Sequence, residues 1–176
     1  MPTSGAGTSA EEGFTLVELA VALLVAGLLF GLALTRFMPP EGSGALRADA
    51  LALAEGIRKL RNHAVSSGLM VRLRLRLPAG AWKAEGMDNL GNWNPLQGSP
   101  VPAGELSRGI QLRRVRWGSG KEISEGEAEL RILPTGETQE IYLYLSDGRR
   151  HERTLTVHPF LNRVDVQRGR VEAHAR

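Results

Sequence analysis

The sequence predicts an α+β protein with two unlike helices ahead of its strands. Three observations support this. Residues 14–35 are almost entirely apolar, residues 45–67 carry apolar positions at helical spacing, and the later residues alternate apolar with polar side chains. We therefore expect a long hydrophobic helix, then an amphipathic helix packed on one face of an antiparallel sheet.

Length and composition leave room for one domain of ordinary size, or for a small domain with an appendage. The chain has 176 residues, of which 42% are hydrophobic and 23% are charged, close to the values of globular proteins. The net charge of +3 is too small to indicate a nucleic-acid partner by itself. Because there is no cysteine, disulfide frameworks, thiolate metal sites and thiol nucleophiles are excluded.

The apolar run from Phe14 to Thr35 is long enough to form a single-pass membrane anchor. As a helix it would span about 33 Å, against a hydrocarbon core of about 30 Å. Its only charged side chain is Glu18, and an ionised carboxylate is costly in hydrocarbon unless something pairs with it. No Lys or Arg precedes Arg36, so a backbone amine created by cleavage shortly before Glu18 is the cation that this chain could supply.

Three other interpretations of this run stay open. A cleavable secretory signal would need a basic segment before the apolar run, and residues 1–13 hold no Lys or Arg. A buried core helix would need a second apolar shell, whereas the strands have one solvated face. In a plain anchor, Glu18 would form a capping box with Thr15 and satisfy backbone N–H groups of the first turn.

One motif in this region is highly specific. It resembles the processing site of type IV prepilins and type II secretion pseudopilins, in the run Gly13-Phe14-Thr15-Leu16-Val17-Glu18-Leu19. The resemblance implies that residues 1–13 are a leader peptide, cut off by a prepilin peptidase between Gly13 and Phe14, and that the Phe14 amine is methylated. It also implies that Glu18 neutralises the N-terminal amine of a neighbouring subunit during filament assembly.

The leader departs from the family pattern in its charge. Leaders of this family usually carry Lys or Arg just before the glycine, whereas this one ends Glu11-Glu12-Gly13. Either the start codon is misassigned or the peptidase tolerates an acidic leader. The orientation of the anchor therefore depends on the motif and not on the positive-inside rule.

The anchor or filament-core helix is expected over residues 14–38, followed by a hinge over 39–44, where prolines and glycines break a helix. The second helix is expected over residues 45–67. Its apolar positions occupy one face, and its charged residues, Arg61 among them, occupy the rest. We expect Gly68 to end it.

Period-two alternation predicts six or so strands beyond this helix. A strand over residues 71–77 turns into a short partner at Trp82, and residues 85–108 are expected to form a long loop pinned by Trp93. A phase shift inside the strand over residues 110–117 indicates a bulge. The remaining strands are predicted to form an antiparallel meander over residues 128–132, 141–145, 155–157 and 164–166.

This order of elements gives a second resemblance. The helix end Leu60-Arg61-Asn62-His63-Ala64-Val65, the Gly68 that follows and the Leu133–Gly136 turn are similar to the GspH/FimT family of minor pilins and pseudopilins. The resemblance implies a pilin-like fold with a periplasmic head over residues 45–176, on a subunit of the bacterial inner membrane. Its implied partners are the prepilin peptidase and other major and minor pseudopilins, and a contact with a secreted substrate is left open.

No enzyme constellation emerges, so we expect a non-enzymatic protein without cofactor or metal. The histidines lack the spacing of metal ligands, and no Gly-x-Ser-x-Gly nucleophile motif occurs. The segment Gly118-Ser119-Gly120-Lys121 lacks the first glycine and the hydroxyl residue of a phosphate-binding loop. We expect it to be a turn.

The basic C-terminal tail supports an alternative function. Residues 149–176 hold seven Arg against three Asp and Glu, and exposed arginines bind DNA phosphates. By resemblance, the FimT branch captures DNA through a Gly-Arg-x-Arg motif, of which Gly169-Arg170-Val171-Glu172 matches the first half. The candidate DNA contacts are Arg163, Arg168 and Arg170. The simpler interpretation is a solvated strand face with a frayed end.

Overall fold

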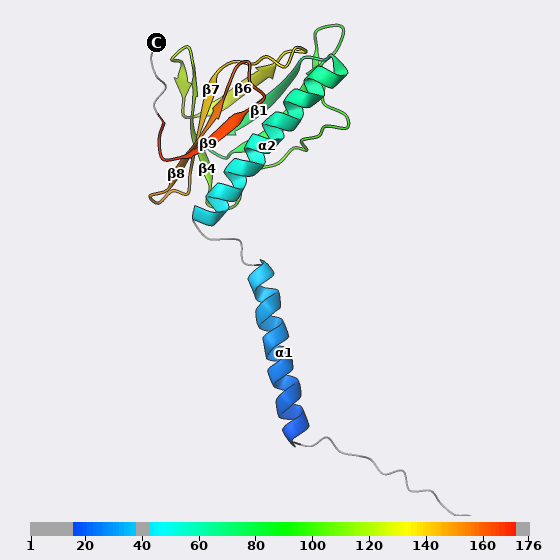
Figure 1. Cartoon of the computed structure of the whole chain (residues 1–176), viewed down its shortest axis with the longest axis vertical. Coiled ribbons are helices and arrows are strands. Elements are labelled where there is room, and N and C mark those ends of the chain that lie inside the picture. Colours follow the sequence, from blue (N-terminus) through cyan, green and yellow to red (C-terminus); the bar gives the residue numbers. More distant parts are fainter. Residues whose placement is uncertain (1–15, 38–42, 172–176) are drawn as a thin grey trace, which may run out of the picture. The chain divides into compact units, whose positions relative to one another are not determined.

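The structure, a computed structural model, describes residues 16–37 and 43–171, and within these it leaves out the side chains of residues 31–37 and 43. The chain divides into two compact units (Figure 1). The first contains the helix α1 (Leu16–Phe37), and the second, called the head, contains the helix α2 (Ser43–Ser67) and the strands β1 to β9. The predicted leader over residues 1–13 and most of the predicted hinge lie outside the described residues.

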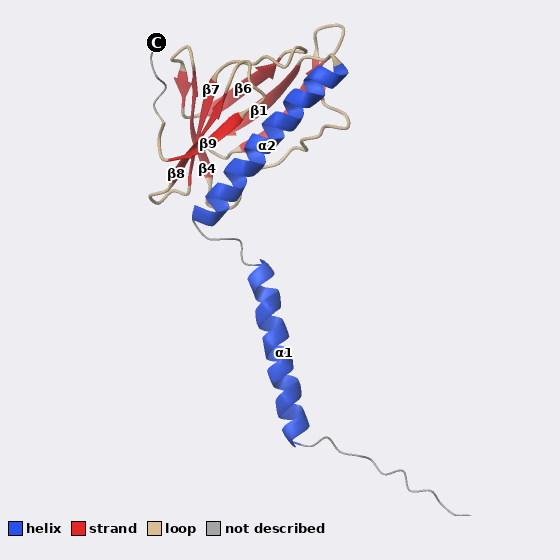
Figure 2. Ribbon diagram, viewed as in Figure 1, coloured by secondary structure: helices blue, strands red, loops and turns tan. Residues whose placement is uncertain are grey.

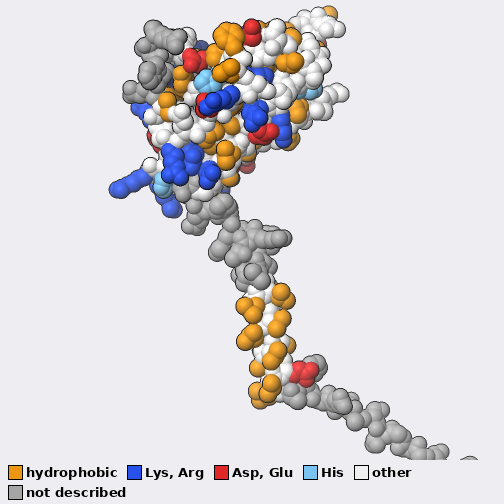
Figure 3. Space-filling view, in the orientation of Figure 1, with side chains coloured by type: hydrophobic (Ala, Val, Ile, Leu, Met, Phe, Trp, Pro, Cys, Tyr) orange, Lys and Arg blue, Asp and Glu red, His pale blue; other side chains and the backbone are white. Residues whose placement is uncertain are grey.

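The helix α1 is apolar on all sides. It has no proline, and Glu18 is its only acidic residue, so the sequence offers nothing that would interrupt a helix. Every described side chain of α1 is exposed, and the face of α1 that Figure 3 shows is apolar apart from one acidic side chain. Among the described residues, no helix has the length and hydropathy that crossing a membrane requires. The transmembrane segment over residues 14–38 therefore stays a prediction.

The helix α2 confirms the predicted amphipathic helix. It begins at Ser43, two residues before the predicted start, and ends at Ser67. Gly68 follows with a φ of 67°, the left-handed conformation that commonly ends a helix and that glycine adopts without strain. The face that packs into the core comprises Leu46, Ala50, Leu53, Ile57, Leu60 and Ala64.

The first sheet has the strand order β3-β2-β1-β6, and all its pairs are antiparallel. The bounds of its strands are Val71–Leu77 for β1, Ala81–Met87 for β2, Trp93–Pro95 for β3 and Gly126–Ile132 for β6. In β1, the apolar positions are buried and the arginines between them face outward, as the alternation predicts.

The prediction of one long loop over residues 85–108 is wrong in part. Its first residues belong to β2, which continues to Met87, and β3 lies inside the segment. Trp93 lies in β3, and the guanidinium carbon of Arg72 stands 4.3 Å from the centroid of its ring. This contact fixes Trp93 against the first sheet, in line with the prediction that Trp93 pins the segment.

The second sheet has the strand order β5-β4-β7-β8-β9 and is also antiparallel. Its strands are Gln111–Trp117 for β4, Glu122–Ile123 for β5, Ile141–Ser146 for β7, Glu152–Val157 for β8 and Val164–Arg168 for β9. The register between β4 and β7 shifts between Leu112 and Arg114, which confirms the predicted bulge. The segment before β5 is a turn, as expected, in which Gly120 has a φ of 89°.

The predicted meander is wrong at its first step. The Leu133–Gly136 turn forms, because the N–H of Gly136 donates to the carbonyl of Leu133 at 2.8 Å. Ile132 of β6 forms one isolated bridge with Thr138, which comes before β7, but β6 and β7 themselves do not pair. β6 pairs along its whole length with β1, and β7 enters the second sheet between β4 and β8. The head therefore contains two sheets where the sequence predicted one.

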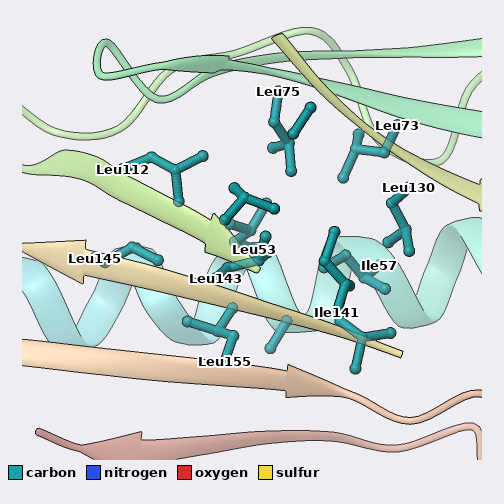
Figure 4. Packing of buried hydrophobic residues seen from close by; sticks show 14 of the residues in the cluster. Leu53, Ile57, Leu73, Leu75, Leu112, Leu130, Ile141, Leu143, Leu145 and Leu155 are labelled. Carbon is teal, nitrogen blue, oxygen red and sulfur yellow. The ribbon is translucent and has the colours of Figure 1, made fainter. Parts of the chain in front are cut away.

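The core of the head lies between α2 and the two sheets (Figures 2 and 4). α2 contacts β8 and β9 most extensively and also touches β1 and β7. The largest fully buried side chains come from α2 and from both sheets. They are Leu46, Ile57, Leu60, Leu73, Leu75, Leu112, Leu130, Ile132, Ile141, Leu143, Leu145 and Leu155.

Both faces of β7 are buried, although its alternation predicted one solvated face. Tyr142 and Tyr144, on the face away from the core, are only 7% and 6% exposed. The hydroxyl of Tyr144 donates to the carbonyl of Val171 at 2.9 Å, and that of Tyr142 donates to the Glu140 carboxylate at 2.8 Å. Burial, followed by the neighbouring Glu140, raises the pKa of Tyr142 to about 12.

A network of charges covers the outer face of the first sheet. Glu85, 5% exposed, accepts hydrogen bonds from Arg72 at 2.7 Å and pairs with Lys83 at 2.8 Å. Arg74 and Arg76 pair with Glu127, and Arg72 also pairs with Glu129. All three arginines of β1 thereby pair with carboxylates within the sheet.

We expect Glu85→Gln to lower the free energy of unfolding of the head by about 2 kcal/mol at pH 7, because it leaves Arg72 and Lys83 facing a neutral group. Burial raises the pKa of Glu85, but the hydrogen bonds and charges of Lys83 and Arg72 outweigh it and lower the pKa overall. The carboxylate therefore stabilises the fold above its unfolded pKa of about 4.5 and loses this effect as the pH falls through its folded pKa. Urea unfolding at several pH values should show the difference between the two proteins shrinking in acid. A difference that is constant with pH would contradict the assignment.

Candidate functional site

The residues of the predicted processing site are placed only in part. Gly13 and Phe14 lie outside the described residues, so cleavage and methylation at these positions stay predictions. Glu18 lies in the first turn of α1, which begins at Leu16. An acidic side chain in the first turn of a helix is stabilised by the positive end of the helix dipole. This position fits both the capping interpretation and the pairing interpretation of Glu18.

The three tail arginines do not form one patch in the head. Arg163 lies just before β9, and its guanidinium donates to the Asp165 carboxylate at 2.5 Å. Arg168 ends β9 and stands opposite Arg153 of β8. Four residues lie between the two arginines, so five steps of extended chain separate them by about 16 Å. Arg170 lies beyond Arg168 and is exposed.

The described part of the tail is held on the second sheet and is not frayed. The N–H of Gly169 donates to the carbonyl of Glu152 at 2.8 Å, and the hydroxyl of Thr154 donates to the carbonyl of Gly169 at 2.8 Å. Two residues further on, the carbonyl of Val171 accepts a hydrogen bond from the hydroxyl of Tyr144. Alternation alone gives no sign of these contacts, because the residues of the sheet that form them lie in β7 and β8, 15 or more residues earlier in the chain.

Arg168 joins other arginines around a hollow at the end of the head where α2 begins. Two of these, Arg47 and Arg113, were missed by the sequence analysis because they are far apart in the chain. One feature of the sequence could have indicated this group of arginines. Arg149 and Arg150 follow the Asp147-Gly148 turn and place two adjacent cations on an exposed hairpin.

Arg61 does not lie on the solvated face of α2, where the sequence placed it. The side chain is 3% exposed and donates to the carbonyls of His158 and Leu161, the first at 2.7 Å. Burial lowers the pKa of Arg61. The guanidinium thus ties the end of α2 to the turn between β8 and β9, which comes about a hundred residues later.

We expect Arg61→Ala to lower the free energy of unfolding by about 3 kcal/mol, because two backbone carbonyls lose a charged donor. Arg58→Ala is the matched control, since Arg58 is half exposed and pairs only with Glu55 at 3.2 Å. Its effect should stay within about 0.5 kcal/mol. Urea unfolding of both variants measures the difference, and equal effects would show that the buried contacts contribute nothing.

The described residues hold no group of three or more His, Asp or Glu side chains arranged to bind a metal ion. Two histidines pair with single carboxylates. His151 lies 2.7 Å from Asp147, and His158 lies 2.9 Å from Asp165. Each pair joins residues close in sequence at a hairpin and suits a structural role.

The arrangement of the head matches known structures. A scan against protein-family models finds no match, and a search of curated proteins finds none either. The matches in a search of solved structures include two structures of the minor pseudopilin EpsH from the type II secretion system of Vibrio cholerae. One is 17% identical in sequence, covers 73% of this chain and 98% of that chain, and has a TM-score of 0.61. The other is 16% identical, covers 70% and 96%, and has a TM-score of 0.54.

The head has the fold of a minor pseudopilin. This likeness confirms the α+β, pilin-like fold that the GspH/FimT resemblance implied.

Proposed function

We propose that this chain is a non-enzymatic minor pseudopilin, a structural subunit of the pseudopilus of a type II secretion system. The observation that carries the proposal is the presence, in one chain, of a prepilin-type motif over residues 13–19 and a head with the pseudopilin fold. The motif and the head share no residues, so the two lines of support are independent. Either alone would be weaker, because a fold is compatible with several functions.

In this proposal the apolar segment over residues 14–38 has two successive environments. Before assembly it anchors the subunit in the bacterial inner membrane, with the head in the periplasm. After cleavage by prepilin peptidase it packs into the core of a helical filament with other major and minor pseudopilins. The exposed apolar side chains of α1 support this, because such a surface is unfavourable in water and suits either lipid or neighbouring helices.

Processing is tested by co-expressing the chain with a prepilin peptidase and determining the N-terminus of the product by mass spectrometry. We expect a protein that begins at Phe14 with a methylated amine. Gly13→Val is the control, since it adds a branched side chain at the bond to be cut and should leave the leader attached. A mature chain that begins anywhere other than Phe14 would remove the basis of the proposal.

The second candidate function is DNA binding for uptake by a FimT-like minor pilin. The exposure of Arg168 and Arg170 favours it. The pairing of Arg163 with Asp165 does not, because it neutralises one of the three candidate contacts. A gel shift with the head and an Arg168→Ser/Arg170→Ser variant tests it. A salt-sensitive shift that the variant loses would support DNA uptake over secretion.

A further inference from the structure

Six arginines gather at one end of the head, around a hollow of about 810 Å³. They come from the first turns of α2, from β4, from the turn between β7 and β8, and from the ends of β8 and β9. We call this surface the arginine pole, and it comprises Arg47, Arg113, Arg149, Arg150, Arg153 and Arg168. Figure 3 shows the Lys and Arg side chains gathered where α2 begins.

The charges of the arginine pole are not compensated within the described residues. The only acidic residue that lines the hollow is Glu152, and no described carboxylate lies within 4.0 Å of the six guanidinium groups. The nearby Asp147 is occupied by His151 and by the N–H of Arg149 at 2.9 Å. Burial, followed by the charges of Arg168 and Arg47, lowers the pKa of Arg153.

This differs from the arginines of the first sheet, which lie beside carboxylates. Arg72, for example, pairs with Glu85 at 2.6 Å and with Glu129 at 2.9 Å. Carboxylates of the head therefore neutralise the arginines of the first sheet, whereas the arginine pole is available to bind an external anion. Arginine bridges phosphate oxygens with two parallel hydrogen bonds, so a phosphate-bearing surface fits the arginine pole.

The place of the arginine pole in the chain indicates which phosphates it meets. α2 begins at this pole, and only residues 38–42 separate its start from the end of α1. A chain of that length reaches about 20 Å when fully extended. The short connection therefore ties the start of α2, where the arginine pole lies, to the membrane or filament that contains the apolar segment.

We propose that the arginine pole binds the head groups of anionic phospholipids at the surface of the membrane that holds residues 14–38. The inference rests on the proposed function, because that function puts a lipid surface next to the start of α2. The contact would hold the head against the bilayer before assembly and must break when the subunit moves into the filament. Anionic head groups attract such basic surfaces over roughly a Debye length, about 8 Å at physiological salt.

The isolated head is suited to the test, because residues 43–176 contain the whole of its core. Every buried apolar side chain of the described residues lies between Ala45 and Val157. We expect the head to sediment with vesicles of phosphatidylcholine that contain about one-third phosphatidylglycerol, and not with vesicles of phosphatidylcholine alone. Binding should weaken steeply as the salt concentration rises. Equal sedimentation with both vesicles, or with neither, would overturn the proposal.

Arg149→Ser/Arg150→Ser removes two exposed cations of the arginine pole on the turn between β7 and β8. It should weaken binding to the anionic vesicles about tenfold or more, since each arginine near the surface contributes about fivefold. Arg58→Ser/Arg131→Ser is the matched control, because it changes the net charge equally but removes arginines that pair with acids elsewhere. The control should bind within about twofold of the unaltered head. Equal weakening in both variants would mean that net charge, and not this surface, controls binding.

Duplex DNA is the competing source of phosphate. If the head shifts a duplex in a gel and ignores the anionic vesicles at the same salt concentration, the arginine pole is a nucleic-acid surface and the lipid proposal is wrong. Failure of the lipid-binding proposal is distinguishable from failure of the proposed function. Cleavage before Phe14 without vesicle binding would remove only this inference, whereas a chain that is never cut there would remove the proposed function.

Discussion

Replacing Glu18 by alanine is expected to abolish incorporation of the subunit into filaments and to leave cleavage after Gly13 intact. In the proposed filament, the Glu18 carboxylate meets the N-terminal amine of Phe14 in a neighbouring subunit, in an apolar core. Removing the carboxylate leaves a buried amine without its counter-charge, which costs several kcal/mol per subunit. The measurement is the fraction of the variant in sheared filaments when it is expressed with its partner subunits, together with the N-terminal mass.

Glu18→Gln separates this pairing from helix capping. A glutamine three residues after Thr15 can still complete a capping box, but it carries no charge. The pairing proposal therefore predicts that Glu18→Gln fails to assemble, as Glu18→Ala does. The plain-anchor interpretation predicts that Glu18→Gln assembles normally. Normal assembly of Glu18→Gln would show that the charge of Glu18 is not needed.

Leu143→Ala is expected to lower the free energy of unfolding of the head by about 3–4 kcal/mol. Leu143 is 0% exposed on β7, and its partners across the sheet, Val115 and Leu155, are fully buried as well. Deleting a leucine side chain there removes apolar burial and leaves a cavity that the surrounding sheet closes only in part. Urea unfolding of the isolated head, followed by circular dichroism, measures the change.

Leu90→Ala is the matched control for this prediction. The same atoms are deleted, but Leu90 is 87% exposed in the turn between β2 and β3. We expect a change within about 0.5 kcal/mol. A loss at Leu90 equal to that at Leu143 would contradict the placement of the core between α2 and the two sheets.

Local features of the head could be predicted from the sequence. The buried face of α2 follows from apolar residues such as Leu53 and Ile57 at helical spacing, and its end follows from Gly68. The bulge in β4 follows from a shift of phase after Leu112, and the hairpin between β7 and β8 follows from Asp147-Gly148. In each of these the cause lies within a few residues of its effect.

Predictions that depend on distant partners were wrong. The alternation in β6 shows that one face is buried, but it does not say whether β1 or β7 lies beside it, and the structure has β1. Arg61 looked like a surface cation, because its acceptors, the carbonyls of His158 and Leu161, are remote in the chain. The burial of Tyr144 likewise depends on Val171.

By itself, the sequence determined the two helices, the longer strands and the prepilin-type motif, because periodicity, turn chemistry and a contiguous motif are properties of neighbouring residues. Only the tertiary structure decided the division into two sheets, the burial of Arg61 and the gathering of six arginines at one end of the head. Those arginines range from Arg47 to Arg168 in the chain. Electrostatic and packing energies depend on distance in space, and only the folded chain sets those distances.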